Sequence, residues 1–329
     1  MLSLVIPIYK SEDNLDRLLA ELVSLQPRVS GGMETVFVID GSLDRCSDIL
    51  TEQLPQSGIR AQLITLSRNF GSFSAIAAGL ANGKGERFAV LAADLQEPTD
   101  LVVEFNDIMR RGEADIVFGV RAGRSDPWLA ELTSNLFWWV YKKFVVPEMP
   151  AGGVDVFGCT RAVRDQLLRL QEVNTNLIAL LFWLGYRRQF VRYVRRSRLE
   201  GQSAWTFAKR LQYSINSIFN FTDLPIRILL AFGVAGCLLA VITGITVLVC
   251  KLLGLIDVPG YTPLILAITF FGGLTALGLG IVGQYLWLTL QNTRGRPNYV
   301  VQASDSFNTD AGEGSIRSAA ASRSGGGLP

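Results

Sequence analysis

The stretch FAVLAADLQEP, residues 88–98, is apolar for six residues and then turns polar at a single point. Phe88–Ala93 has the composition of a buried strand. The polar residues that follow it are Asp94, Gln96 and Glu97. An earlier stretch, TVFVIDGSLD at residues 35–44, repeats the arrangement, because its β-branched and aromatic run ends on Asp40. Two predicted strands therefore end on side chains that could bind a ligand.

Strand and helix patterns alternate around these stretches through residue 120. The expected strands are Leu2–Ile8, Thr35–Ile39, Ala61–Leu66, Phe88–Ala93 and Ile116–Val120, and the expected helices are Glu12–Leu25, Ser47–Leu54, Ser72–Asn82 and Leu101–Arg111. This alternation is typical of an open, mostly parallel α/β sheet, in which ligands bind beyond the carboxyl ends of the strands. Asp40 and Asp94 are therefore expected at a binding site.

The composition narrows the chemistry, because the 329 residues include no histidine. A Ser-His-Asp triad, a Cys-His dyad and an HExxH zinc site are excluded on that ground. The four cysteines have no CxxC or other metal-type spacing, which indicates a reducing compartment without structural disulfides. Catalysis would then use carboxylates, amides and arginines, with or without a hard metal ion.

Two long uncharged runs in the second half of the chain predict membrane-spanning helices. The runs are 23 residues between Arg227 and Lys251 and 36 residues between Asp257 and Arg294. Because a spanning helix needs about 20 apolar residues, we expect spans at about 228–250 and 263–290, within a transmembrane domain of residues 226–293. Two buried core helices are the alternative interpretation.

Positive charge predicts how these helices would lie in a membrane. Residues 186–227 contain nine Lys or Arg against two acids, and two arginines follow the second span. By the positive-inside rule, both termini are expected in the cytoplasm. The N-terminal apolar run is too short for a signal peptide and lacks a leading basic region, so the first domain is expected on the same side.

A segment rich in arginine precedes the first expected span. This arginine-rich segment, RRQFVRYVRRSR at residues 187–198, has six arginines in twelve residues. A solvated basic face or a nucleic-acid site would explain such a cluster, but its place before membrane spans favours anionic lipid or one lipid phosphate. Residues 201–225 then have the spacing of an interfacial amphipathic helix. The tail, residues 294–329, is expected to be disordered beyond about residue 303.

The spacing Asp94-x-Gln96 has two interpretations. It can be the polar turn that ends a strand, or it can hold Mg²⁺ or Mn²⁺, since hard cations take oxygen ligands and share them with substrate phosphates. Asp40, at the end of a second strand, favours the metal site. The stretch GLANGKGE, residues 79–86, lacks the spacing of a phosphate loop and is interpreted as a helix end and turn.

Together these parts indicate a cytosolic domain that joins a soluble phosphorylated donor to a lipid phosphate. A lipid phosphate already carries negative charge at neutral pH, since its second pKa is about 6. It would therefore attack with little need of a general base, which fits a chain without histidine. Catalysis would rest on positioning and on neutralising the leaving diphosphate.

Six stretches follow one another along the chain in a set order: LSLVIPIYKSEDNL, VIDGSLD, LSRNFGSFSAIAAGL, AADLQEP, VFGVR and GQSAW. This set resembles the family 2 glycosyltransferases, in particular the polyprenyl- and dolichyl-phosphate glycosyltransferases, over about residues 2–300. The resemblance implies a Rossmann-like GT-A catalytic domain at residues 1–200. It also implies inverting transfer of a sugar from a nucleotide-sugar to polyprenyl phosphate, with Mg²⁺ or Mn²⁺ and no nucleic-acid partner.

The resemblance further implies roles for individual positions. The catalytic residues would be Asp94, Asp155 and Arg121. The nucleotide-sugar would contact Pro7, Tyr9, Glu12, Asp40, Arg68, Asn69 and Asp94. The lipid phosphate would contact Arg198 and Ser203, to which the charge of the arginine-rich segment adds Arg195 and Arg196. The metal ligands would be Asp94 and Gln96.

The chain departs from the family pattern at a few positions. Ile39 and Ala92 stand where the family usually has the first Asp of Asp-Asp-Gly-Ser and of Asp-Ala-Asp, and Ala204-Trp205 replaces Lys-Tyr. In a divergent subgroup, Asp94, Gln96, water and the diphosphate would hold the metal; a changed donor is a second interpretation. The alternative function is a membrane-tethered sensor or scaffold that binds nucleotide-sugar without turnover.

The subgroup also suggests the substrates. UDP-glucose is the expected donor and undecaprenyl phosphate the expected acceptor, in cell-envelope glycan synthesis at a bacterial inner membrane. GDP-mannose, UDP-GlcNAc and an aminoarabinose donor stay open. Small residues in the second span permit close helix packing, so a homo-oligomer such as a tetramer is expected. These residues are Gly272, Gly273, Gly278, Gly280 and Gly283.

Overall fold

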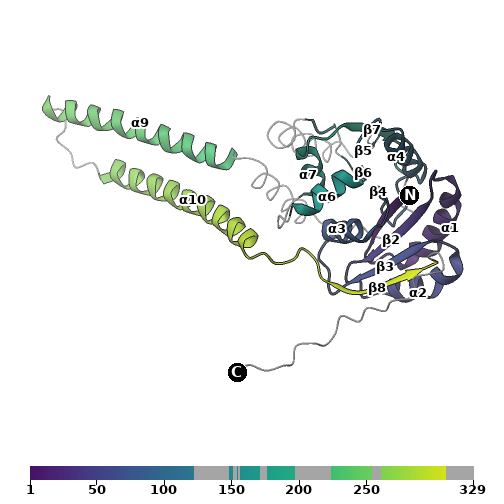
Figure 1. Ribbon diagram of the computed structural model, residues 1–329. Coiled ribbons are helices and arrows are strands. Elements are labelled where there is room, and N and C mark those ends of the chain that lie inside the picture. Colours follow the sequence, from purple (N-terminus) through teal and green to yellow (C-terminus); the bar gives the residue numbers. More distant parts are fainter. Residues whose placement is uncertain are drawn as a thin grey trace, which may run out of the picture. The chain divides into compact units, whose positions relative to one another are not determined.

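The computed structural model of the chain divides into two units (Figure 1). It describes residues 1–121, 148–150, 154, 156–170, 176–196, 224–253 and 261–308. The α/β unit comprises residues 1–206 and 297–329, and the helical unit comprises residues 207–296. The expected helix at 201–225 lies outside the described residues, apart from its last two positions, and so do Asp155, Arg198, Ser203, Ala204 and Trp205.

Within its described residues, the α/β unit is built on one eight-stranded sheet. The strands are β1 (Leu2–Ile8), β2 (Met33–Ile39), β3 (Ala61–Leu66), β4 (Arg87–Val90), β5 (Ile116–Arg121), β6 (Val156–Thr160), β7 (Arg188–Tyr193) and β8 (Val301–Phe307). The helices are η1 (Glu12–Asn14), α1 (Leu15–Leu25), η2 (Gln26–Arg28), α2 (Cys46–Ser57), α3 (Ser72–Asn82), α4 (Asp100–Arg110), α6 (Arg161–Arg169) and α7 (Leu177–Trp183).

The sheet has the strand order β7-β5-β6-β4-β1-β2-β3-β8. β6 pairs antiparallel with both β4 and β5, and β8 pairs antiparallel with β3. The other pairings are parallel. β1 to β5 and β7 therefore all end at the same edge of the sheet, which we call the carboxyl edge. The expected α/β class with a mostly parallel sheet is confirmed.

Apolar side chains on both faces of the central strands explain this layered arrangement. β2 is buried along its whole length, as a parallel strand covered on both faces should be. On one face, α1 buries a row of five leucines against Leu4 and Ile6 of β1. On the other face, α3 lies so close that a Cβ atom at Gly79 would be 2.3 Å from Val5 Cγ1. Helices thus cover the sheet from both sides and leave its carboxyl edge to the loops (Figure 1).

The expected elements of the first 120 residues are confirmed, with shifted ends. β4 stops at Val90, three residues before the predicted end, because the chain turns at Ala92, whose carbonyl accepts a hydrogen bond from the Leu95 amide. The predicted helix Glu12–Leu25 begins as the 3-10 turn η1. The GLANGKGE stretch is a helix end and turn, as expected. Glu34 holds this turn, because its carboxylate accepts from the Lys84 amide and the Ser3 hydroxyl.

Three strands were not expected from the sequence. β6 follows a part of the chain that gave no clear pattern, and β7 lies inside the arginine-rich segment. β8 runs to Phe307, beyond residue 303, where the tail was expected to become disordered. Its sequence VQASDSF is largely polar, and the pairing with β3 supplies the order that its own composition does not. The prediction of disorder is therefore wrong for the last four residues of β8.

The helical unit consists of α9 (Leu224–Leu252) and α10 (Tyr261–Thr293), each longer than the predicted span. Among the described residues, one segment, Phe270–Gln291 of α10, is long and apolar enough to cross a membrane. Large apolar side chains are exposed on both helices, including Phe232, Leu238, Ile245, Leu279 and Leu286. Two spanning helices therefore stay a prediction.

Candidate active site

The carboxyl edge carries most of the predicted site residues that the structure describes. They come from separate stretches of the chain, which the parallel strands bring to one side of the sheet. The residues are Pro7, Tyr9 and Glu12 at the end of β1, Asp40 after β2, Arg68 and Asn69 after β3, Asp94 and Gln96 after β4, Arg121 at the end of β5, and Arg195 and Arg196 after β7. The sequence therefore identified the edge on which a site can form.

Asp40 fastens the loop after β3 to the end of β2. Its two carboxylate oxygens accept hydrogen bonds from the backbone amides of Phe70 (2.7 Å) and Gly71 (2.9 Å), directly before α3. The residue is only 3% exposed. Burial raises the pKa of the Asp40 carboxyl, and the two amide hydrogen bonds and the Arg68 guanidinium only partly offset this effect. Asp40 thus anchors the two residues that lead into α3.

The loop formed by residues 67–71 follows β3 and lies against the backbone of Gly41. Gly41 has a φ of +57°, and a Cβ atom there would lie 2.2 Å from the Arg68 carbonyl carbon, so only glycine fits. Asn69 Nδ2 donates to the Asp40 carbonyl at 3.2 Å. Arg68 is exposed, and its guanidinium lies 4.0 Å from the centre of the Phe70 ring. This loop therefore holds an exposed arginine over the carboxyl edge.

The segment after β1 is joined to the loop after β2. The Lys10 amide donates to the Ser42 hydroxyl at 2.8 Å. Glu12 Oε2 accepts a hydrogen bond from the Arg45 amide at 3.0 Å, at the start of α2. Tyr9 is 38% exposed. Glu12 is thus engaged in holding the start of α2, whereas the Tyr9 side chain is open to a ligand.

The loop of residues 91–99 carries the predicted metal motif and connects β4 to α4. We call it the β4 loop. Asp94 Oδ1 accepts a long hydrogen bond (3.4 Å) from the Gln96 amide, and the Asp94 side chain is half-buried. Between them, Leu95 is buried with a φ of +52°, a conformation that costs a non-glycine residue about 1–3 kcal/mol. Surrounding contacts must hold this turn in place.

Arg195 and Arg196 supply several of those contacts. Arg195 Nη2 donates to Gln96 Oε1 at 2.6 Å, and its Nε lies 3.6 Å from Glu97 Oε1. The Arg196 amide donates to the Gln96 carbonyl at 2.8 Å. Both arginines were predicted to bind lipid phosphate. The structure places them on the predicted metal motif.

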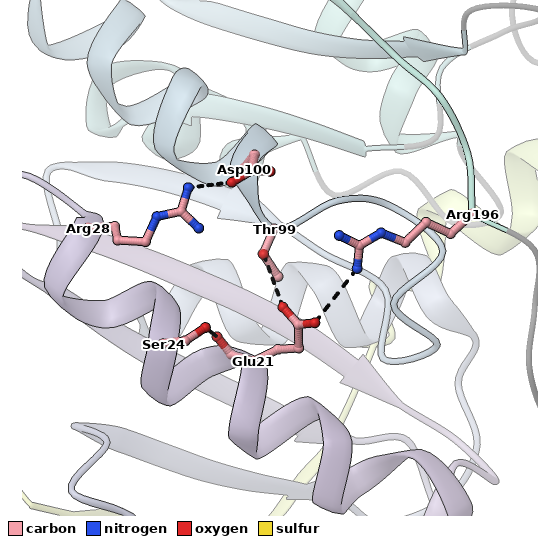
Figure 2. Close-up of polar contacts among 6 residues, drawn as sticks. All are labelled: Glu21, Ser24, Arg28, Thr99, Asp100 and Arg196. Atoms are coloured by element: carbon pink, nitrogen blue, oxygen red, sulfur yellow. Dashed lines mark hydrogen bonds and ion pairs between the residues drawn. The ribbon is translucent and has the colours of Figure 1, made fainter.

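Figure 2 shows how α1 takes part in the same arrangement. The Glu21 carboxylate of α1 accepts from the Thr99 hydroxyl at 3.3 Å and lies 3.7 Å from Arg196 Nη1. An ion pair between Arg28 and Asp100 joins the end of η2 to the first residue of α4. Glu21, Glu97 and Thr99 were not among the predicted site residues. Glu97 had a signal, because it ends the polar group after β4; Glu21 and Thr99 had none.

The residues present fit a divalent cation only with help from a substrate. No group of three or more His, Cys, Asp or Glu side chains in the described part of the chain could hold a metal ion. Asp94 offers one carboxylate, and Gln96 could add only the oxygen lone pair that Arg195 leaves available. Mg²⁺ commonly binds through one or two carboxylates when substrate phosphates and water complete the coordination. The donor set suits a metal shared with a diphosphate.

Comparison with known proteins tests the family. The profile of glycosyl transferase family 2 matches residues 3–170, slightly more than half of the chain. The chain belongs to this family. The matched residues include the β4 loop and the ends of β1, β2, β3 and β5. The part of the carboxyl edge that these elements form therefore lies within the family match. The protein is a glycosyltransferase, and its α/β unit has the GT-A fold expected from the sequence.

Family 2 relatives match nearly the whole chain. A Synechocystis protein described as uncharacterized glycosyltransferase sll0501 is 33% identical over 91% of this chain and 94% of its own length. The putative glycosyltransferase CsbB of Bacillus subtilis is 31% identical over 95% and 94%. A prophage bactoprenol glucosyl transferase homolog of Escherichia coli is 28% identical over 92% and 98%. The similarity therefore includes the residues of α9 and α10.

Proposed function

We propose that this glycosyltransferase is membrane-anchored and inverting, and that it moves glucose from UDP-glucose to undecaprenyl phosphate. The observation that carries the proposal is the contact between the β4 loop and residues 195–196, at 2.6 and 2.8 Å. Residues 195–196, which precede the expected lipid-phosphate residues Arg198 and Ser203, are therefore bound to the loop that carries the expected metal residue Asp94. Donor and acceptor chemistry would meet at the carboxyl edge.

The reaction needs no histidine. An oxygen of the lipid phosphate would attack the anomeric carbon of the sugar from the face opposite the leaving group. The bond from that carbon to the nucleoside diphosphate breaks, and the diphosphate leaves with the electron pair. Because the attacking phosphate is largely ionised at pH 7, with a second pKa of about 6, no side chain has to remove a proton. The products are the inverted lipid-phosphate sugar and the nucleoside diphosphate.

Residues at the carboxyl edge would bind and orient the donor. Among the residues expected to contact the nucleotide-sugar, Tyr9 and Arg68 are exposed, whereas Glu12, Asp40 and Asn69 hold the surrounding loops. Asp94 would hold Mg²⁺ or Mn²⁺, which would neutralise charge on the diphosphate. Pro7 would pack near the nucleotide, Arg121 would contact the donor phosphate, and Asp155 would lie near the reacting carbon.

Names of relatives support the acceptor and the sugar. The Escherichia coli relative is described as a bactoprenol glucosyl transferase homolog, and a Shigella phage SfII relative as a bactoprenol glucosyl transferase. Both are similar to this chain over 92% of its length. A polyprenyl phosphate acceptor and a glucose donor are the proposals that agree with these names. The lipid product would serve cell-envelope glycan synthesis.

α9 and α10 would anchor the enzyme in a bacterial inner membrane, with both termini in the cytoplasm. The exposed apolar surface of both helices supports this placement. In water, large side chains such as Leu279 and Leu286 would stay exposed to solvent, whereas in a membrane they would contact lipid. In α10, Gly278 lies against Leu229 of α9, while a Cβ atom at Gly272, Gly273, Gly280 or Gly283 would have no neighbour within 4 Å among the described residues. These four positions leave room for a second copy of the chain, in agreement with the proposed homo-oligomer.

One observation favours the alternative, a sensor or scaffold that binds nucleotide-sugar without turnover. Ala92 lies at the turn of the β4 loop, where the family usually has a second acid, and it leaves Asp94 as the carboxylate of the motif. A site with a single carboxylate could bind a donor without activating it. Glycosyl transfer and donor binding alone differ in one product, the free nucleoside diphosphate.

Release of nucleoside diphosphate is therefore the experiment that tests the proposal. Purified protein would be assayed with UDP-glucose and other nucleotide-sugars, with and without undecaprenyl phosphate and Mn²⁺ or Mg²⁺. We expect release that needs both lipid and metal and that falls by at least about 100-fold in Asp94→Ala, the size of effect expected when electrostatic stabilisation of the transition state is removed. Asp48→Ala, which removes an exposed carboxylate from α2, should leave the rate unchanged. Saturable donor binding without any release would support the sensor instead.

A further inference from the structure

The two arginines that follow β7 hold the β4 loop from more than one side. The Arg195 side chain reaches the Gln96 amide oxygen at 2.6 Å and the Glu97 carboxylate at 3.6 Å. The Arg196 backbone amide donates to the Gln96 carbonyl at 2.8 Å. Both ends of the Gln96 residue, its side chain and its backbone, are thus bound by one short segment. Such a double attachment restricts the position of the loop.

The partners of Arg195 are unusual for an arginine that serves a lipid. Glu97 is 2% exposed, and a carboxylate buried to that degree needs a cation or hydrogen-bond donors nearby. The Arg195 side chain is itself about two-thirds buried, at 32% exposure. Its planar guanidinium can address an amide oxygen and a carboxylate together, which a lysine could not do in the same way. This arginine is therefore built into the α/β unit.

Arg196 extends the same attachment to α1. Its guanidinium lies 3.7 Å from the Glu21 carboxylate, which also accepts a hydrogen bond from Thr99 at the far end of the β4 loop (Figure 2). Residues 195 and 196 thereby contact the loop at Gln96 and Glu97 directly and at Thr99 through Glu21. Asp94 lies two residues before Gln96, on the other side of the strained Leu95. Fixing Gln96 therefore also limits where the Asp94 carboxylate can lie.

We propose that Arg195 is a positioning residue, which acts through Gln96 and Glu97 to hold the Asp94 carboxylate in place, and that it does not bind the lipid phosphate. The inference deepens the proposed function and rests on it for the role of Asp94. The lipid phosphate is then left to residues further along the chain, such as Arg198 and Ser203. Arg196 assists through its backbone amide and through Glu21.

The first measurement is hydrogen exchange of the β4 loop, because it needs neither substrate nor turnover. Arg195→Met removes the guanidinium and keeps a long side chain, and Gln96→Ala removes the acceptor. We expect either change to speed amide exchange in residues 91–99 by about tenfold, the equilibrium equivalent of one hydrogen bond to a charged group. Arg192→Met is the matched control, because Arg192 is an exposed arginine of the same segment on β7. It should leave exchange in the loop unchanged.

The second measurement separates the metal from the lipid. Binding of Mn²⁺ in the presence of UDP would be followed by electron paramagnetic resonance, and KM for undecaprenyl phosphate would be measured on the same proteins. Arg195→Met should weaken Mn²⁺ binding by about five- to tenfold and change KM for the lipid by less than about twofold. In the exchange measurement, combining it with Gln96→Ala should add little, since both changes remove the same contact. Arg195→Lys should restore part of the metal affinity.

The opposite pattern would overturn the inference. If Arg195→Met raises KM for undecaprenyl phosphate at least fivefold while loop exchange and Mn²⁺ affinity stay at the wild-type values, Arg195 binds the acceptor. If Arg195→Met does not fold, Gln96→Ala and Arg195→Lys decide the question through the same exchange measurement. Should the wild type show no turnover at all, the proposed function fails, whereas faster exchange in the Arg195→Met loop would still support the attachment.

Discussion

Asp40 illustrates, at the scale of one residue, how a predicted ligand contact can have a structural role. Its position at the end of β2 made it a candidate for the nucleotide, yet both carboxylate oxygens accept backbone amides of the loop after β3. Glu12 behaves in the same way at the start of α2. Acidic side chains at the carboxyl edge therefore shape the loops, and exposed residues such as Tyr9 and Arg68 are left to meet a donor.

A prediction about the same loop concerns Gly41. Gly41→Ala would have to accept a φ of +57° and would also bring Cβ to 2.2 Å from the Arg68 backbone. The left-handed conformation costs about 1–2 kcal/mol, and displacing the backbone of the loop should cost about 1–3 kcal/mol more. Thermal unfolding of purified variants would measure the loss of stability. A titration with UDP would measure the weaker UDP binding that we expect when Arg68 is displaced.

Gly58→Ala is the control for this change. Gly58 has a φ of +70°, but no atom of the part of the chain that the structure describes would lie within 4 Å of a Cβ atom there. Its replacement should therefore cost only the conformational part and leave UDP binding unchanged. Equal destabilisation of the two variants, or equal UDP affinity, would show that the contact between Gly41 and the Arg68 backbone is not critical.

At the scale of the elements, β8 is the part of the α/β unit that the sequence least suggested. It pairs with β3 from Ala61 to Leu66, and the Ser67 amide donates to the Val300 carbonyl at 3.0 Å. Ser67 directly precedes Arg68. β8 thus borders the loop that carries an exposed arginine over the carboxyl edge. The last residue before the undescribed tail, Asn308, secures the strand by donating to the carbonyls of Leu54 and Ile59.

Asn308 gives a prediction for this element. Asn308→Gly keeps the φ of +52° accessible but removes both hydrogen bonds, and Asn308→Ala loses the bonds and adds strain. Leaving two carbonyls without these donors should cost about 1–3 kcal/mol. We expect faster amide exchange in β8 and β3 for both variants, and more for Asn308→Ala. Unchanged exchange in β8 would mean that the strand is held by its pairing with β3 alone.

How far the sequence could predict these elements depended on the pattern that each one carries. Strands such as β2 and helices such as α1 have strong apolar periodicity, and their existence was predicted. β7 was hidden because its sequence RQFVRY lacks a regular alternation of apolar and polar residues, and its arginines lie at the edge of the sheet, where charged side chains reach water or acids. β8 was hidden because its order comes from β3. Local patterns contain no information on such partners.

The candidate site was predictable to a similar extent. Side chains that follow strands had to lie on the carboxyl edge, since parallel strands end together. Their partners did not follow, because the contacts of Arg195 with Gln96 and of Glu21 with Thr99 join parts of the chain far apart in sequence. Assigning Arg195 to a lipid phosphate followed from its charge and from the expected spans. Its contacts place it on the β4 loop.

At the scale of the whole molecule, the proposed topology can be tested by labelling. The turn between α9 and α10 should face the periplasm if both helices span the membrane. A cysteine in place of Asp257, in a chain whose Cys237 and Cys250 are replaced by serine, should react with an impermeant maleimide in intact cells. The buried Cys46 and Cys159 should not contribute, since burial raises the pKa of each thiol to about 12.

Leu43→Cys supplies the matched cytoplasmic probe. Leu43 is 98% exposed on the loop after β2, so the fold does not shield a cysteine at this position from the reagent. If the α/β unit lies in the cytoplasm, the membrane alone keeps the reagent away. The cysteine should be labelled only after the membrane is permeabilised. Two results would contradict the proposed orientation: labelling of both positions in intact cells, or no labelling of the cysteine at position 257 in intact cells that becomes labelled only after permeabilisation.

β8 has a consequence for the order in which the protein is made. The strand is translated after α10, so the outer edge of β3 has no partner from this chain while α9 and α10 are being synthesised. An unpaired strand edge is a template for wrong pairing. The α/β unit can therefore reach its complete sheet only once the ribosome has finished both apolar helices. A nascent chain released early would carry the residues of the carboxyl edge on a sheet that is still open.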